Sequence, residues 1–77
     1  MNNYPYHLKC NAPRYEQHRG YSEENKNLAI DDFESLQRQF QAKHYPVKSY
    51  FRSNPLRGTI QVEIDGFFYY VELYKEK

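Results

Sequence analysis

The sequence predicts an α+β fold in the order β-α-β-β-β, a small antiparallel sheet with one helix packed on one face. Three observations support this prediction. The last part of the chain alternates polar and apolar residues around Asp65-Gly66, a dipeptide well suited to a two-residue hairpin turn. A central segment has apolar residues at helical spacing. Two shorter segments alternate with the period of a β-strand. At 77 residues, the chain 1–77 is long enough for one domain.

The first predicted element is a short strand over Tyr6–Cys10. Its alternation places Cys10 on the apolar face and His7 on the opposite face. The segment that follows, 11–27, is polar and contains a proline and Gly20. It predicts a long loop, of a length that is often functional or mobile.

The predicted helix covers about 31–43. Asp31 is the expected N-cap, and Glu34 three residues later completes a capping box. Pro46 ends the helix, because the residue before a proline is disfavoured in helical geometry. An earlier start at an Asn27 cap fits the same pattern. The apolar positions that define the buried stripe are Ile30, Phe33, Leu36 and Phe40.

A strand is predicted over Val47–Ser53, with Asn54-Pro55 as the turn that follows it. The hairpin then runs over 59–64 and 67–74, and its two-residue turn determines the register. This register pairs Ile64 with Phe67 and continues outward from there. It assigns Phe67 and Tyr69 to the core under the helix, together with Ile60, Val62, Ile64, Val71 and Leu73.

The other face of the hairpin carries Phe68, Tyr70 and Tyr74, where a strand buried on one side should carry polar residues. Such aromatic side chains are favoured at the centres of protein interfaces. Three explanations stay open. The chain's own N-terminal segment folds over this face, a homodimer forms through it, or a foreign partner binds there.

Charge is segregated along the chain. Between Ser35 and Val62 there is no acidic residue. This stretch instead contains cations interleaved with aromatic residues, among them Lys48, Tyr50, Phe51, Arg52 and Arg57. Surfaces that bind single-stranded nucleic acid combine cations, which contact phosphates, with aromatic rings, which stack on bases. An acidic protein can bind the same kind of surface. The plain alternative is a solvated sheet edge and helix end.

Composition excludes several classes of function. Eleven basic and ten acidic residues give a net charge of +1, so no global field favours DNA or an anionic membrane. Cys10 is the lone cysteine, and no signal peptide or apolar span is present, which predicts a soluble protein of a reducing cytoplasm, in the producing cell or in an infected host. No phosphate-binding loop, metal-ligand spacing or nucleophile–base pair is present. We therefore expect no enzyme activity, cofactor, metal or small-molecule substrate.

The function predicted from the sequence is binding without catalysis. The expected partner is a protein, which the chain blocks or modulates by steric occlusion, in the manner of compact phage or mobile-element inhibitors and accessory proteins. The predicted partner-binding residues are Phe68, Tyr70, Tyr74, Lys48, Tyr50, Arg52 and Arg57. The alternative is a single-stranded nucleic-acid-binding module that uses Lys48, Tyr50, Phe51 and Arg52.

Overall fold

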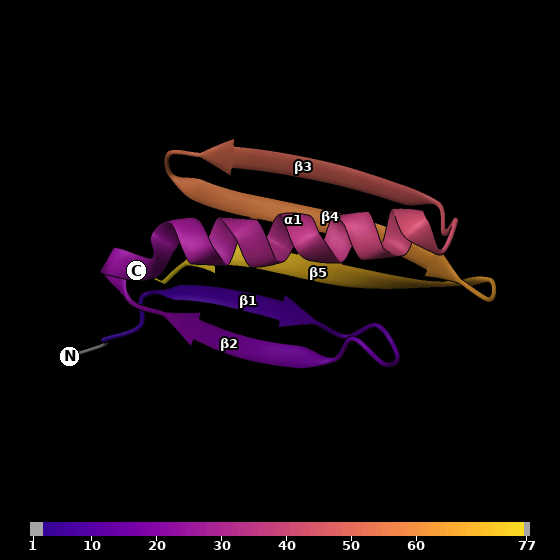
Figure 1. The fold of residues 1–77 in the computed structure, drawn as a ribbon, viewed down its shortest axis with the longest axis horizontal. Coiled ribbons are helices and arrows are strands. Elements are labelled where there is room, and N and C mark those ends of the chain that lie inside the picture. The colour runs from indigo at the N-terminus through magenta and orange to yellow at the C-terminus, as the bar shows by residue number, and fades with distance from the viewer. Residues whose placement is uncertain (1–2, 77) are drawn as a thin grey trace.

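Five strands form one antiparallel sheet in the computed structural model, which describes residues 3–76. The elements are β1 (Tyr6–Cys10), β2 (Gln17–Tyr21), a 3-10 turn (Glu23–Asn25), α1 (Lys26–Ala42), β3 (Val47–Ser53), β4 (Leu56–Ile64) and β5 (Phe67–Lys75). The strands lie side by side in the order β2-β1-β5-β4-β3. The helix α1 lies across one face of this sheet (Figure 1). The predicted fold class, a small antiparallel sheet with one helix on it, is confirmed.

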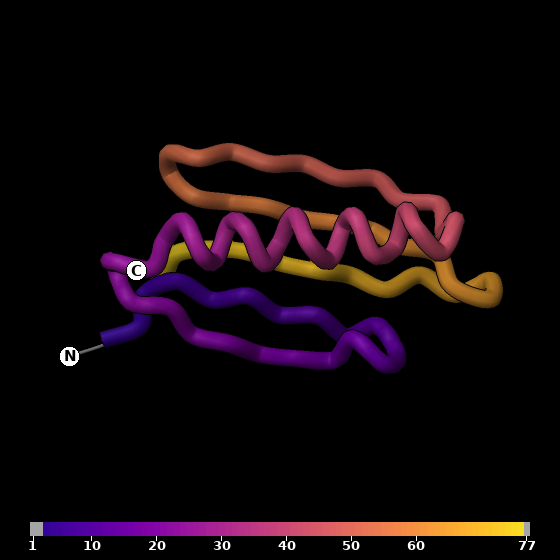
Figure 2. Tube along the Cα trace, in the orientation of Figure 1, coloured from indigo at the N-terminus to yellow at the C-terminus, as the bar shows by residue number. Residues whose placement is uncertain are grey.

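The first and last strands of the chain pair with each other in the middle of the sheet. β1 pairs with β5, so that Leu8 lies opposite Leu73. This pairing joins the N-terminal hairpin β1–β2 to the β3–β4–β5 meander, and both described ends of the chain lie at the same end of the molecule (Figure 2). The N-terminal segment therefore widens the sheet.

The core lies between α1 and the sheet. Phe33, Leu36 and Phe40 of the helix are buried against apolar side chains from β1, β4 and β5. Gly58 lies inside β4, which begins at Leu56, three residues before the predicted strand 59–64. A Cβ atom there would lie 2.8 Å from the Phe33 ring, so the absence of a side chain makes room for that ring.

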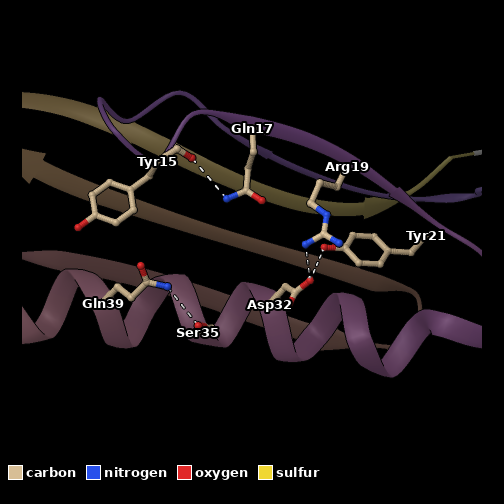
Figure 3. Close-up of polar contacts among 7 residues, drawn as sticks. All are labelled: Tyr15, Gln17, Arg19, Tyr21, Asp32, Ser35 and Gln39. Atoms are coloured by element: carbon tan, nitrogen blue, oxygen red, sulfur yellow. Dashed lines mark hydrogen bonds and ion pairs between the residues drawn. The ribbon is translucent and has the colours of Figure 1, made fainter.

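The prediction of a loop over 11–27 is wrong for a large part of that segment. It contains β2 and the 3-10 turn, and α1 begins within it. β2 has little apolar alternation, and Tyr21 is its one buried residue. The strand is held by its pairing with β1 and by the Asp32 carboxylate of α1, which accepts hydrogen bonds from Tyr21 and Arg19 (Figure 3).

The helix begins earlier than predicted, and its capping is different. α1 starts at Lys26, directly after the 3-10 turn, and no side chain of Asn25 caps it. Asp31 therefore lies inside the helix rather than at its N-terminus, and the predicted capping box with Glu34 is wrong. At the other end, the chain reverses at His44, whose φ is 63°, and the N–H of Tyr45 donates to the Phe40 carbonyl. This reversal ends the helix before Pro46.

The hairpin register is confirmed, but one core assignment is wrong. Ile64 pairs with Phe67 and Val62 with Tyr69, as the Asp65-Gly66 turn predicts. Tyr69 is half-buried and packs against the core, whereas Phe67 is 66% exposed. The reason is the length of the helix: α1 ends at Ala42, and the hairpin tip extends beyond it (Figure 1). Ile64, which lies opposite Phe67, is still buried at 8% exposure, so within this last pair only the β5 side chain is left in solvent.

Candidate partner-binding surface

The sheet face opposite α1 is here named the open face. The pairing of the strands defines its members, because successive side chains of a strand point to opposite faces. The open face carries His18 of β2; His7 and Lys9 of β1; Phe68, Tyr70, Glu72 and Tyr74 of β5; Arg57, Thr59, Gln61 and Glu63 of β4; and Lys48, Tyr50 and Arg52 of β3.

All seven residues predicted to bind a partner lie on the open face, but at two different ends of it. Tyr70 lies in one cross-strand row with Gln61 and Lys48, and Phe68 lies one step beyond. Tyr74 lies in another row, with Arg57 and Arg52. Tyr50 lies between these rows, opposite Thr59.

Three aromatic side chains of this face are open to solvent. Phe68 is 54% exposed, and Tyr70 and Tyr50 are each 49% exposed. The explanation in which the N-terminal segment covers the face does not hold for residues 3–76, because β1 and β2 lie beside β5 in the same sheet. The three rings come from two strands, Tyr50 from β3 and the other two from β5.

Tyr74 differs from the other predicted anchors. Its ring stacks on the imidazole of His7, with the centroids 5.3 Å apart and the planes 19° from parallel. His7 in turn contacts His18 at 3.2 Å and the Glu76 carboxylate at 2.6 Å. Tyr74 is thus half-buried within the chain's own contacts. No local pattern in the chain predicts this cluster, because it depends on the long-range pairing of β1 with β5.

The charges of the open face are unevenly distributed. Arg52 and Arg57 lie directly opposite each other across β3 and β4. Arg57 contacts Glu72 at 3.3 Å, while the Arg52 guanidinium donates to the Tyr50 hydroxyl at 3.0 Å. Like charges placed opposite each other in a sheet are destabilising. Glu72 compensates the charge of Arg57, whereas within residues 3–76 the Arg52 guanidinium has only the neutral Tyr50 hydroxyl as a hydrogen-bond partner.

Shallow hollows separate the exposed rings. One of about 370 Å³ is lined by Lys48, Tyr50 and Tyr70, among others. A second, of about 280 Å³, lies between Lys48, Gln61 and Phe68. A third, of about 470 Å³, lies on the β1 side of Tyr70 and includes Lys9 and His18. The rings thus stand between recesses that side chains of a partner can fill.

Cys10 is buried on the helix side of the sheet, while His7 lies on the open face. Burial raises the pKa of the Cys10 thiol, which opposes formation of a thiolate nucleophile. Within residues 3–76, no three His, Cys, Asp or Glu side chains gather where they could hold a metal ion.

No protein-family model, curated protein or solved structure matches this chain. In the part of the chain that the structure describes, no helix has the length and apolar character needed to span a membrane.

Proposed function

We propose that this chain is a non-catalytic binding protein whose open face docks on a protein partner and blocks or modulates it. The observation that carries the proposal is the set of rings Tyr50, Phe68 and Tyr70, each about half exposed on a sheet face that residues 3–76 leave uncovered. Burial of such rings supplies most of the favourable free energy in protein interfaces.

The charge of the open face also supports a protein partner. Glu63 lies directly opposite Phe68, and Glu72 lies opposite Thr59 in the same part of the sheet. These carboxylates repel phosphate, whereas a protein surface can match both signs. Lys48 and Arg52 would then increase the rate of encounter with an acidic surface.

The experiment is a pull-down that compares how well two double variants capture the protein partner. Phe68→Ala with Tyr70→Ala removes exposed rings from the open face, and we expect loss of capture with a thermal midpoint within a few degrees of the parent. Phe67→Ala with Leu28→Ala is the matched control, since these exposed side chains, 66% and 45%, lie away from the open face. Equal capture by both variants would contradict the proposal.

A single-stranded nucleic acid is the second candidate partner. It is favoured by the alternation of Lys48, Tyr50 and Arg52 along β3, beside the hollow that Tyr70 also lines. Such a surface pairs cations with phosphates and rings with bases. Its binding should weaken steeply with added salt, and failure to bind oligothymidylate at low salt would eliminate this candidate.

A further inference from the structure

β3 is an edge strand of seven residues, of which Val47 packs against the core and the other six are exposed. Among residues 3–76, no strand lies beyond it, and α1 covers the middle of the sheet (Figure 1). Residues 48–53 are all exposed, including Phe51 on the helix side, which is 44% exposed. The opposite edge, β2, is shorter and is joined to α1 through Asp32.

The pairing of β3 with β4 shows which backbone groups point outward. The Glu63 N–H donates to the Pro46 carbonyl at 3.0 Å, so these two residues form a hydrogen-bonded pair. Hydrogen-bonded and non-hydrogen-bonded pairs alternate in an antiparallel ladder. Lys48, Tyr50 and Arg52 therefore bond to β4, whereas the N–H and C=O groups of Ser49 and Phe51 point away from the sheet.

We infer that this edge accepts an extended segment of the protein partner as an added antiparallel strand, with carboxylates of that segment beside Lys48 and Arg52. This inference rests on the proposed function and names the form of the partner's docking segment. The outward groups of Ser49 and Phe51 supply main-chain hydrogen bonds, as in other cases of strand addition. The exposed Phe51 ring selects an apolar side chain on the other face of the incoming strand.

Charge distinguishes this occupant from a second copy of the chain. β3 carries Lys48 and Arg52 and no acidic residue, and its neighbour Arg57 adds a third cation on the same face. Two copies paired along β3 would bring all these cations together, which is unfavourable. A strand with two carboxylates four residues apart, one beside Lys48 and one beside Arg52, has the opposite charge on the same side.

The test is amide hydrogen exchange by NMR on the full chain, with a synthetic peptide as probe. The peptide Val-Glu-Val-Thr-Val-Glu-Val, added to millimolar concentration, should slow exchange at Ser49 and Phe51. Exchange at Tyr50 and Arg52 should be slow already, because these amides bond to β4. A matched peptide with Lys in place of both Glu should have little effect. Unchanged exchange at Ser49 and Phe51 with the acidic peptide would overturn the inference.

Variants separate strand addition from other modes of binding. Ser49→Pro removes an outward N–H without touching the bonds to β4, which is where edge strands tolerate proline. It should abolish the slowing at Phe51, while Ser49→Ala, which keeps the N–H, should preserve it. Slowing that depends on protein concentration without peptide would assign the edge to a second copy and overturn the inference.

The same measurement distinguishes failure of the inference from failure of the proposed function. The Phe68→Ala, Tyr70→Ala variant should retain the slowing at Ser49 and Phe51, because these rings lie on β5 and not on the edge. Two results together would support the proposed function and refute strand addition. They are loss of partner capture in that variant and no effect of the acidic peptide on β3 in the parent protein.

Discussion

The Tyr21 hydroxyl donates a hydrogen bond of 2.7 Å to the Asp32 carboxylate, and this bond joins the edge strand β2 to the helix (Figure 3). Arg19 contacts the same carboxylate oxygen at 3.1 Å. Tyr21 is buried, while the Asp32 side chain is 29% exposed, so the contact lies at the margin of the core. The outer strand is thus attached by a polar contact where apolar side chains are few.

Tyr21→Phe should destabilise the protein by about 1 kcal/mol, because it removes a hydrogen bond to a charged group that water can partly replace. The check is urea unfolding of both proteins at neutral pH. Arg19→Ala is the comparison: its ion pair with Asp32 is more exposed, and its loss should cost less. A larger loss for Arg19→Ala would show that charge, rather than the buried hydroxyl, holds β2.

Stability should fall as the solution becomes alkaline. Burial and the hydrogen bond to Asp32 raise the pKa of Tyr21, and burial and the bond to Glu23 raise the pKa of Tyr6. The folded state therefore keeps these protons above pH 10, where the unfolded chain releases them. This contribution is complete below about pH 10 and is lost as pH rises towards the folded pKa values. Urea midpoints measured from about pH 9 to about pH 11 test this, and Tyr21→Phe should show a shallower decline.

Local patterns in the sequence were sufficient for the elements whose partners are close along the chain. The Asp65-Gly66 turn determines the β4–β5 register without further information, and alternation in Tyr6–Cys10 places its two faces correctly. β2 was missed because Gln17–Tyr21 is stabilised by backbone bonds to β1 and by Asp32, and neither leaves an apolar pattern.

Local patterns were likewise sufficient for only part of the candidate surface. Alternation separated the two faces of β5, but it is the β3–β4 register that places Lys48, Tyr50 and Arg52 on the same face as Phe68, Tyr70 and Tyr74. The addition of His7, Lys9 and His18 to that face follows from β1–β5 pairing across most of the chain, which no local spacing encodes. The exposure of Phe67 depends on where α1 ends relative to the hairpin tip, which is a property of the packed structure.

Gly58→Ala should destabilise the protein by about 1–3 kcal/mol. The added Cβ would lie 2.8 Å from the Phe33 ring, which is 1% exposed, so this buried ring or the backbone must shift to relieve the clash. Gly66→Asn is the comparison: nothing lies within 4 Å of an added Cβ, and asparagine is among the residues that best tolerate a positive φ, so backbone strain at φ 84° is its main cost and its loss of stability should be smaller. Thermal unfolding of both variants is the measurement. An unchanged midpoint for Gly58→Ala would mean that the strand and helix separate easily.

Cys10 should react slowly with an aromatic disulfide reagent in the folded protein and quickly in urea. The thiol is buried, and burial raises its pKa, so both access and thiolate content are low. The reaction rate at pH 8 should rise with urea in parallel with global unfolding. Rapid reaction without urea would indicate that β1 opens locally, since Cys10 lies at the end of that strand.

Arg52→Glu should separate stability from binding. In the folded protein Arg52 lies opposite Arg57, and replacing that like-charge pair by an opposite-charge pair should raise the free energy of unfolding by a few tenths of a kcal/mol. The same change places a carboxylate where the inferred acidic strand docks, so binding of the acidic peptide should be lost. Arg38→Glu, an exposed position on the helix, makes the same change in net charge and should leave peptide binding intact. Urea unfolding and the peptide titration measure the two effects. If Arg52→Glu instead weakened the fold and kept the peptide, the cations of β3 would serve the sheet rather than a partner.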